Sequence, residues 1–176
     1  MKKLFSLVLI SSMIIASFNS CAQTDKSKRP SPPAKVSETI SNGTMVSIDY
    51  SQPSLKGRTI GKDVEPMDGK IWRAGANEAT VFEVNKDIMI NGQKLAAGKY
   101  ALFMIANPGE WTIIFNKKWD TDGAFDYEKN KSLDVLHVKV KPMTPATPAQ
   151  KLTYAIAKDG TVSLVWGDKK VAFKVS

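Results

Sequence analysis

Apolar and polar residues alternate with a period of two along much of the chain. In 45–50, the apolar residues Val46, Ile48 and Tyr50 fall on one face, with polar residues between them. Such alternation is typical of a β-strand that buries one face. The same pattern, together with short apolar runs, predicts further strands at 81–84, 88–90, 95–105, 111–116, 133–140, 152–157, 162–166 and 171–175.

Short turn signals separate these predicted strands. Asn91-Gly92 is the strongest, because both central residues of a type I′ hairpin turn need a positive φ. Asn107-Pro108-Gly109, Asp159-Gly160 and Gly167-Asp168 mark further turns. The segment 141–150 is rich in proline, which does not fit a central strand, so we expect an edge or crossover connection there.

No window keeps a helical period over three turns. The pattern therefore predicts an all-β fold: a β-sandwich or jelly-roll-like pair of antiparallel sheets, with little or no helix outside the N-terminal leader. A chain of this size buries enough apolar surface to fold without disulfides.

The N-terminal residues have the pattern of an export signal. Lys2 and Lys3 precede an uncharged apolar stretch at 4–18, which is short for a membrane span and fits a secretory signal. Cys21 is the only cysteine, and it stands where a bacterial lipoprotein carries its lipid, although the residues before it match a lipobox loosely. We therefore expect an exported envelope protein, lipid-anchored through Cys21 on a periplasmic or surface face. The alternative is cleavage after Ala22 and release as a soluble secreted protein.

This interpretation divides the chain into three parts. We expect a signal peptide at 1–20, a lipidated cysteine with a Pro-rich tether at 21–35, and a single all-β domain at 36–176. An extended Pro-rich segment covering 23–34 reaches roughly 37 Å. The folded domain is expected to begin near Val36.

Composition narrows the range of partners. Removal of 1–20 lowers the net charge from +8 to +6, and the remaining lysines are scattered rather than clustered. The pattern therefore indicates no nucleic-acid partner. With one histidine and no cysteine beyond Cys21, the mature chain cannot build a thiolate or multi-imidazole metal site. No metal or cofactor is expected, and the expected membrane contact is the lipid anchor.

Arginine is rare in this chain and draws attention where it occurs. Of 25 basic residues, the arginines are Arg29, in the expected tether, and Arg58 and Arg73, in the domain. The planar five-donor guanidinium pairs bidentately with a carboxylate or phosphate, which a lysine cannot do. Arg73 lies in 71–80, the stretch least like a plain strand.

Two interpretations of this stretch remain open. In the first it lines a ligand cleft, where an arginine clamps an anion, an indole offers a stacking face and an amide and a carboxylate bind polar groups. The ligand would be a small polar or anionic molecule or a glycan. The candidate ligand-binding residues are Arg58, Trp72, Arg73, Asn77 and Glu78. In the second, which the sequence favours, Arg73 pairs with Glu78 inside the protein, because structural ion pairs imitate functional sites.

Catalytic chemistry finds weaker support. His137 alternates with Val135 and is expected to be a strand residue that is either satisfied by neighbouring groups or on the surface, on the face opposite Asp134. Glu78 with Asp134 or Asp49 forms a possible carboxylate pair for an envelope hydrolase, although no spacing brings two of them together. No residue is assigned a catalytic role.

The tryptophans offer a further possibility. Trp111, Trp119 and Trp166 are the residues from which a sugar-stacking platform could be built. Trp166 ends an alternating strand and is expected in the core, whereas Trp119 is expected to be exposed.

Several stretches, in this order, resemble the domain of unknown function 2911 family. They are 51–58, 72–80, 95–103 and 111–116, of which 72–80 is the most specific. The resemblance covers about 32–140 and is looser after Pro142. Members of this family look like secreted or lipid-anchored envelope proteins of Bacteroidota-type bacteria. The resemblance implies location and fold, and it brings no activity, substrate or cofactor.

The sequence therefore predicts an envelope lipoprotein that serves as a non-catalytic binding or structural module. The alternatives are a small-ligand or glycan binder that uses the stretch 72–80 and a carboxylate-dependent envelope hydrolase.

Overall fold

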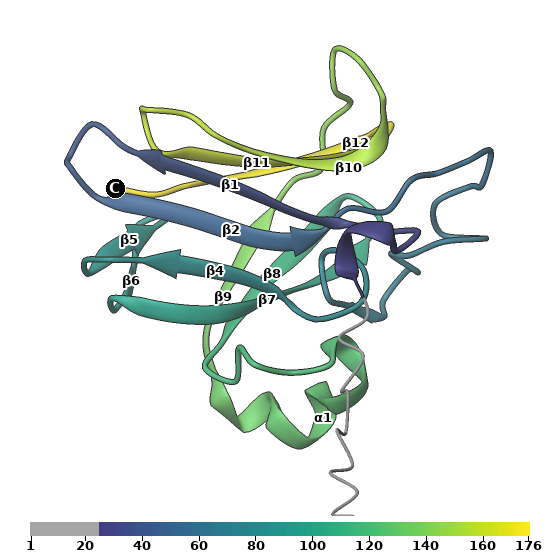
Figure 1. The fold of residues 1–176 in the computed structure, drawn as a ribbon. Coiled ribbons are helices and arrows are strands. Elements are labelled where there is room, and N and C mark those ends of the chain that lie inside the picture. Colours follow the sequence, from purple (N-terminus) through teal and green to yellow (C-terminus); the bar gives the residue numbers. More distant parts are fainter. Residues whose placement is uncertain (1–24) are drawn as a thin grey trace, which may run out of the picture.

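Antiparallel strands dominate residues 25–176, the part of the chain that the computed structural model describes (Figure 1). The all-β prediction is confirmed. The strands are β1 (Pro33–Thr39), β2 (Met45–Ser51), β3 (Ile71–Trp72), β4 (Thr80–Val84), β5 (Ile88–Ile90), β6 (Gln93–Leu95), β7 (Gly98–Asn107), β8 (Glu110–Asn116), β9 (Asp134–Val140), β10 (Ala149–Ile156), β11 (Thr161–Gly167) and β12 (Lys169–Lys174).

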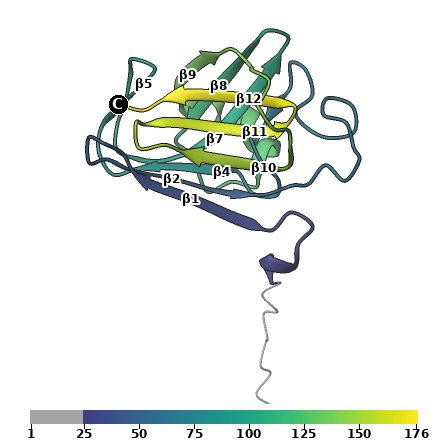
Figure 2. The same cartoon turned by 90° about the horizontal axis from the view of Figure 1, so that it is seen from above.

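The strands form two facing layers. The large sheet has the order β1-β2-β4-β7-β8-β9, and β3 pairs with β7 beside this path. The small sheet, β10-β11-β12, lies across one face of the large one (Figure 1, Figure 2). The proline-rich segment before β10 crosses from the large sheet to the small one, as its prolines predict. The β5-β6 hairpin turns at Asn91 and Gly92, whose φ angles of 45° and 82° match the predicted turn.

The main core fills the space between the two sheets. Phe82 in β4, Phe115 in β8 and Phe173 in β12 meet edge to face, with ring centroids 5.2 to 5.9 Å apart. In β2, Val46, Ile48 and Tyr50 are all buried, so the alternating pattern correctly predicts which face of this strand turns inward.

The outer face of the large sheet carries a short helical stretch that the sequence does not predict. It consists of a 3-10 turn at Gly123–Asp126, the single-turn α1 (Tyr127–Asn130) and a second 3-10 turn at Lys131–Leu133 (Figure 1). Tyr127 packs edge to face on Phe103, with ring centroids 5.0 Å apart, in a small second core. None of these turns is long enough to give a helical period.

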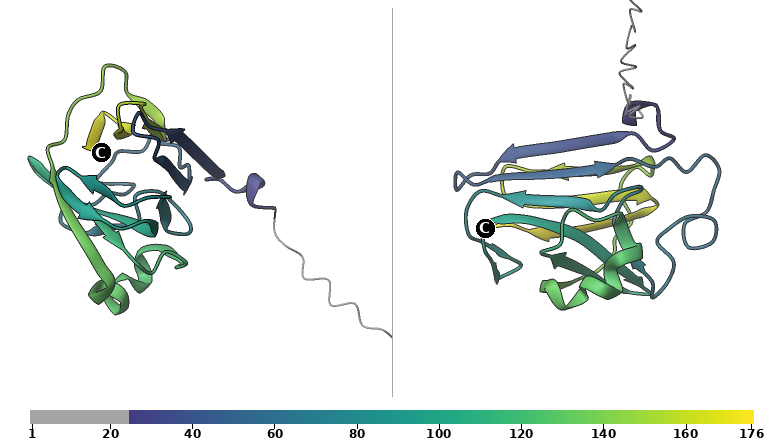
Figure 3. Two further views of the ribbon diagram at one scale, coloured as in Figure 1. Left: turned by 90° about the vertical axis from the view of Figure 1, so that its left-hand side faces the viewer. Right: turned by 60° about the horizontal axis from the view of Figure 1, so that its bottom comes forward.

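The domain begins earlier than the tether prediction allows. β1 starts at Pro33 and pairs with β2 along its whole length, from Pro33 opposite Ser51 to Thr39 opposite Met45 (Figure 3). Proline fits here because β1 is an edge strand, where an N–H can be missing without loss of a ladder bond. Lys26–Lys28 form a 3-10 turn rather than an extended spacer.

The signal peptide, Cys21 and the cleavage position after Ala22 lie outside the described residues. Within 25–176, no helix has the length and apolar character needed to cross a membrane.

Candidate functional site

The stretch 72–80 runs from the end of β3 to the start of β4, and residues 73–79 form an irregular loop between them. Ala74 and Asn77 have φ angles of 53° and 57°, so two non-glycine residues of this loop adopt the left-handed conformation. The Ala74 carbonyl accepts hydrogen bonds from the Thr80 hydroxyl at 3.1 Å and from the Tyr154 hydroxyl at 2.8 Å. Because Tyr154 belongs to β10, the small sheet fixes this loop of the large sheet.

Trp72 is a core residue rather than an exposed stacking face. Its side chain is 2% exposed, packs edge to face on Trp111 and donates its indole N–H to the Gly75 carbonyl at 3.1 Å. The pairing of β3 with β7 brings this indole between the sheets. The prediction that Trp72 offers a ligand an open ring face is therefore wrong.

Glu78 pairs with the N-terminal segment and not with Arg73. Nη1 of Arg29 donates to both carboxylate oxygens, at 2.9 and 3.1 Å, and Nζ of Lys26 lies 2.9 Å from the same carboxylate. These two partners, Arg29 first, lower the pKa of Glu78 to about 2. The expected Arg73–Glu78 pair is wrong, because the partner comes from a segment that was expected to be a free tether.

Arg73 forms no ion pair within residues 25–176. Its guanidinium donates to the Asn77 carbonyl, lies 5.0 Å from the centre of the Phe125 ring and packs directly on Gly123. Burial lowers the pKa of Arg73, and the negative charge of Glu65 opposes part of this effect. A partly desolvated cation without a direct ion pair is thus held in place at this loop, with Glu65 as a negative charge in the same pocket.

Arg58 and Arg73 line the same pocket. It has a volume of about 420 Å³ and also includes Trp72, Asn77 and Trp166 in its wall, whereas Glu78 is not part of it. Arg58 donates Nε and Nη2 to the carbonyls of Leu55 and Ser54, which orient its guanidinium.

The amide of Asn77 is already engaged. Its Nδ2 donates to the Ser31 carbonyl at 2.9 Å, which ties the N-terminal segment to the pocket. The structure thus brings four of the five candidate residues together and leaves two of them, Arg58 and Arg73, with the chemistry of a binding group.

Two acidic residues of this pocket are not among the candidates that the sequence suggests. Asp63 accepts the Thr59 backbone N–H at 2.9 Å, and Glu65 accepts the Met67 backbone N–H at 2.8 Å. Both carboxylates line the pocket with the arginines, so its walls carry two charges of each sign. The only sequence signal was the cluster of charged residues between two glycines.

The chain matches a known protein family over most of the described residues. Residues 31–175 match the family described as "Protein of unknown function (DUF2911)". The chain belongs to the DUF2911 family. No curated protein and no solved structure matches it. The match includes the C-terminal strands.

In this DUF2911 domain, each carboxylate considered for hydrolysis is bound by other side chains. Asp49 pairs with Lys35 at 2.9 Å and, with Glu78, lines a small cavity of about 190 Å³. A pKa of about 2 prevents Glu78 from acting as a general acid at neutral pH. Within 25–176, no group of histidine and acidic side chains is arranged to hold a metal ion.

Asp134 lies in a cluster that alternation did not predict. It accepts hydrogen bonds from Asn116 and Tyr127, each at 2.7 Å, and its Oδ2 lies 2.9 Å from Nε2 of His137. His137 is exposed, which is one of the two predicted surroundings. The prediction that it lies on the face opposite Asp134 is wrong, because the two side chains are in contact. The register of β8 and β9 shifts at Val135, which the pairing skips, so that Asp134 and His137 meet.

The three tryptophans do not form one platform. Trp111 and Trp166 are buried at different pockets, and Trp119 is 41% exposed with Lys99 5.1 Å from its ring. The hypothesis that these three rings form one sugar-stacking surface is therefore wrong.

Proposed function

We propose that this chain is a non-catalytic binding module of the cell envelope, lipid-anchored through Cys21, that binds a small polar ligand by an anionic group. The ligand's carboxylate or phosphate contacts Arg73 and Arg58 in the pocket they share. The single observation that carries this proposal is the unpaired, partly buried guanidinium of Arg73 at a pocket. Burial removes water from this cation, and a bound anion would replace the lost hydration with a charged hydrogen bond.

The charges around the pocket restrict the ligand further. Asp63 and Glu65 balance the two arginines, so the pocket offers no net positive charge to a polyanion. A ligand with one anionic group, or with one anionic and one cationic group, matches this arrangement. The pocket volume of about 420 Å³ falls in the usual range for small-molecule sites.

Titration of the mature protein with acetate, glycine, inorganic phosphate and tripolyphosphate tests the ligand class. We expect acetate, glycine or inorganic phosphate, each with a single anionic group, to bind and raise the melting temperature, with no advantage for tripolyphosphate. Arg73→Ala and Arg58→Ala should each weaken binding by about tenfold or more, because a charged hydrogen bond contributes about 1.5–3 kcal/mol. Lys94→Ala removes a charge outside this pocket and is the matched control. Equal binding by all three variants would contradict the proposal.

The lipid anchor has its own test. Cys21→Ala should abolish incorporation of labelled fatty acid and release the processed chain from the membrane fraction. The mass of the released chain identifies the cleavage position. Fatty-acid labelling that persists in Cys21→Ala would contradict the anchor without touching the ligand proposal.

A further inference from the structure

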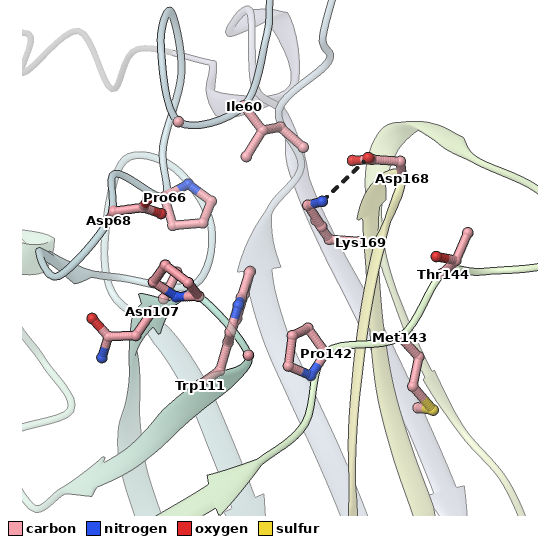
Figure 4. Close-up of a pocket in the computed structure, with 14 residues that line it drawn as sticks. Ile60, Pro66, Asp68, Asn107, Trp111, Pro142, Met143, Thr144, Asp168 and Lys169 are labelled. Atoms are coloured by element: carbon pink, nitrogen blue, oxygen red, sulfur yellow. Dashed lines mark hydrogen bonds and ion pairs between the residues drawn. The ribbon is translucent and has the colours of Figure 1, made fainter.

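A second cavity opens at the same end of the sandwich, on the other side of the loop 58–68. Its volume is about 490 Å³. Four segments far apart in the sequence form it: this loop, the β7–β8 turn, the start of the β9–β10 connection and the β11–β12 turn. Figure 4 shows Trp111 between Asn107 and Pro142 on one side, with Ile60 and Pro66 on the other.

The indole of Trp111 distinguishes this cavity from an ordinary surface hollow. Trp72 and Trp166 are equally buried, and their indole N–H groups donate to the carbonyls of Gly75 and Glu65. Trp111 is 5% exposed and lines the cavity, yet its N–H has no acceptor within residues 25–176. The Trp111 nitrogen is not among the fully buried polar atoms that lack a partner, so it is reached from the cavity and not sealed in the core. A bound ligand oxygen would supply the acceptor.

The polar side chains around this indole are also uncommitted. Asp68, Asn107 and Thr144 line the cavity, and none of their side chains forms a hydrogen bond or ion pair within the described part of the chain. Together they offer a carboxylate acceptor, an amide that both donates and accepts, and a hydroxyl. This mixture matches hydroxyl groups, each of which donates one hydrogen bond and accepts others.

The charge and the walls of the cavity narrow the ligand class. Asp168 is paired with Lys169 at 3.3 Å, so Asp68 leaves one uncompensated negative charge and disfavours an anion. Ile60, Pro66 and Pro142 supply apolar surface against which ring C–H groups pack. We propose that this cavity binds a neutral saccharide unit, with its hydroxyl groups on Trp111, Asp68 and Asn107.

The indole N–H of Trp111 provides a direct reporter. The mature ¹⁵N-labelled protein has four tryptophans and hence four indole N–H resonances, and Trp111→Phe identifies one by its loss. We expect glucose, N-acetylglucosamine, maltose or cellobiose at millimolar concentration to shift the Trp111 resonance saturably. The Trp72 and Trp166 resonances should move less, because their N–H groups already have acceptors inside the protein.

Variants at the cavity decide whether the response is specific. Asp68→Asn and Asn107→Ala change exposed side chains, so the fold should persist, and each should weaken the sugar about tenfold through loss of a hydrogen bond. Glu128→Gln, on α1, is the matched control and should bind normally. The proposal is overturned if none of the four sugars shifts the Trp111 resonance, or if both cavity variants bind as wild type. A Trp111 response to inorganic phosphate or choline, with none to the sugars, overturns it as well.

Discussion

Arg73 and Glu78 lie in one short loop but have opposite surroundings. Glu78 is held by two cations from the N-terminal segment, whereas Arg73 has no anionic partner within residues 25–176. Two left-handed residues, Ala74 and Asn77, lie between them, and the side chains of Arg73 and Glu78 line different cavities. The Glu78 side is thus a completed contact that fixes the chain, and the Arg73 side is an incomplete one that is open to a ligand.

Removal of the Trp72 indole, on which the loop 73–79 packs, should lower the stability of the protein most. Trp72→Ala deletes a fully buried indole and its bond to Gly75, and we expect the free energy of unfolding to fall by about 3–5 kcal/mol. Trp119→Ala, at an exposed position, should cost less than about 1 kcal/mol. Urea unfolding followed by circular dichroism measures both. Equal losses would mean that the loop does not depend on Trp72.

The Glu78 side should have a pH-dependent stability. Its pKa is lowered from 4.5 to about 2, so its contribution is fully present above about pH 4.5 and is lost as the pH falls toward 2. Because Glu78 is 40% exposed, solvent screening reduces the expected loss in Glu78→Gln to roughly 1–2 kcal/mol at pH 7. The difference in urea midpoint between wild type and variant should shrink below pH 4. A difference that stays constant to pH 2 would exclude the ion pairs as its source.

The Arg73 side should respond to Gly123. This glycine has a φ of 85°, and a Cβ added to it would lie 2.5 Å from Nη1 of Arg73. Gly123→Ala should cost about 1 kcal/mol in backbone strain and also displace the guanidinium, which weakens ligand binding in the arginine pocket. Gly92→Ala has a similar φ of 82° with open space around it, so it should show the strain alone. Melting curves and phosphate titration of both variants separate the two effects.

The smallest expected value is the coupling between Arg73 and Glu78. Their side chains share no contact, so the double mutant Arg73→Ala/Glu78→Gln should equal the sum of the single mutants within about 0.3–0.5 kcal/mol. The cycle of Arg29→Ala with Glu78→Gln is the positive control and should show clear coupling. Strong coupling between Arg73 and Glu78 would mean that the two sides of the loop are one network.

The sequence predicts the features of the fold that depend on residues close together in the chain. The positions of β2 and β9 follow from alternation, that of β8 follows from a short apolar run, and the Asn91-Gly92 turn follows from the backbone angles it needs. β1 escapes because Pro33 argues against a strand unless it lies at an edge, which no local pattern states. The helical turns after Asp122 are each too short to have a period.

The site is less predictable than the fold. The rarity of arginine correctly draws attention to Arg58 and Arg73, which share a pocket. The partner of Glu78 lies in a segment that joins the domain only through tertiary contacts, so spacing along the chain points to the wrong arginine. The free N–H of Trp111 is likewise invisible in sequence, because Trp72 and Trp166 look the same and are satisfied.

The contact of Lys26 and Arg29 with Glu78 also sets how far the domain can lie from Cys21. A free segment at 23–34 would let the domain range roughly 37 Å from its anchor. Because the chain is already held at Lys26, only the five steps from Cys21 to Lys26 remain, which span at most about 18 Å when fully extended. With a lipid on Cys21, the domain would therefore work at the headgroup layer of its own membrane and take up only what reaches that surface.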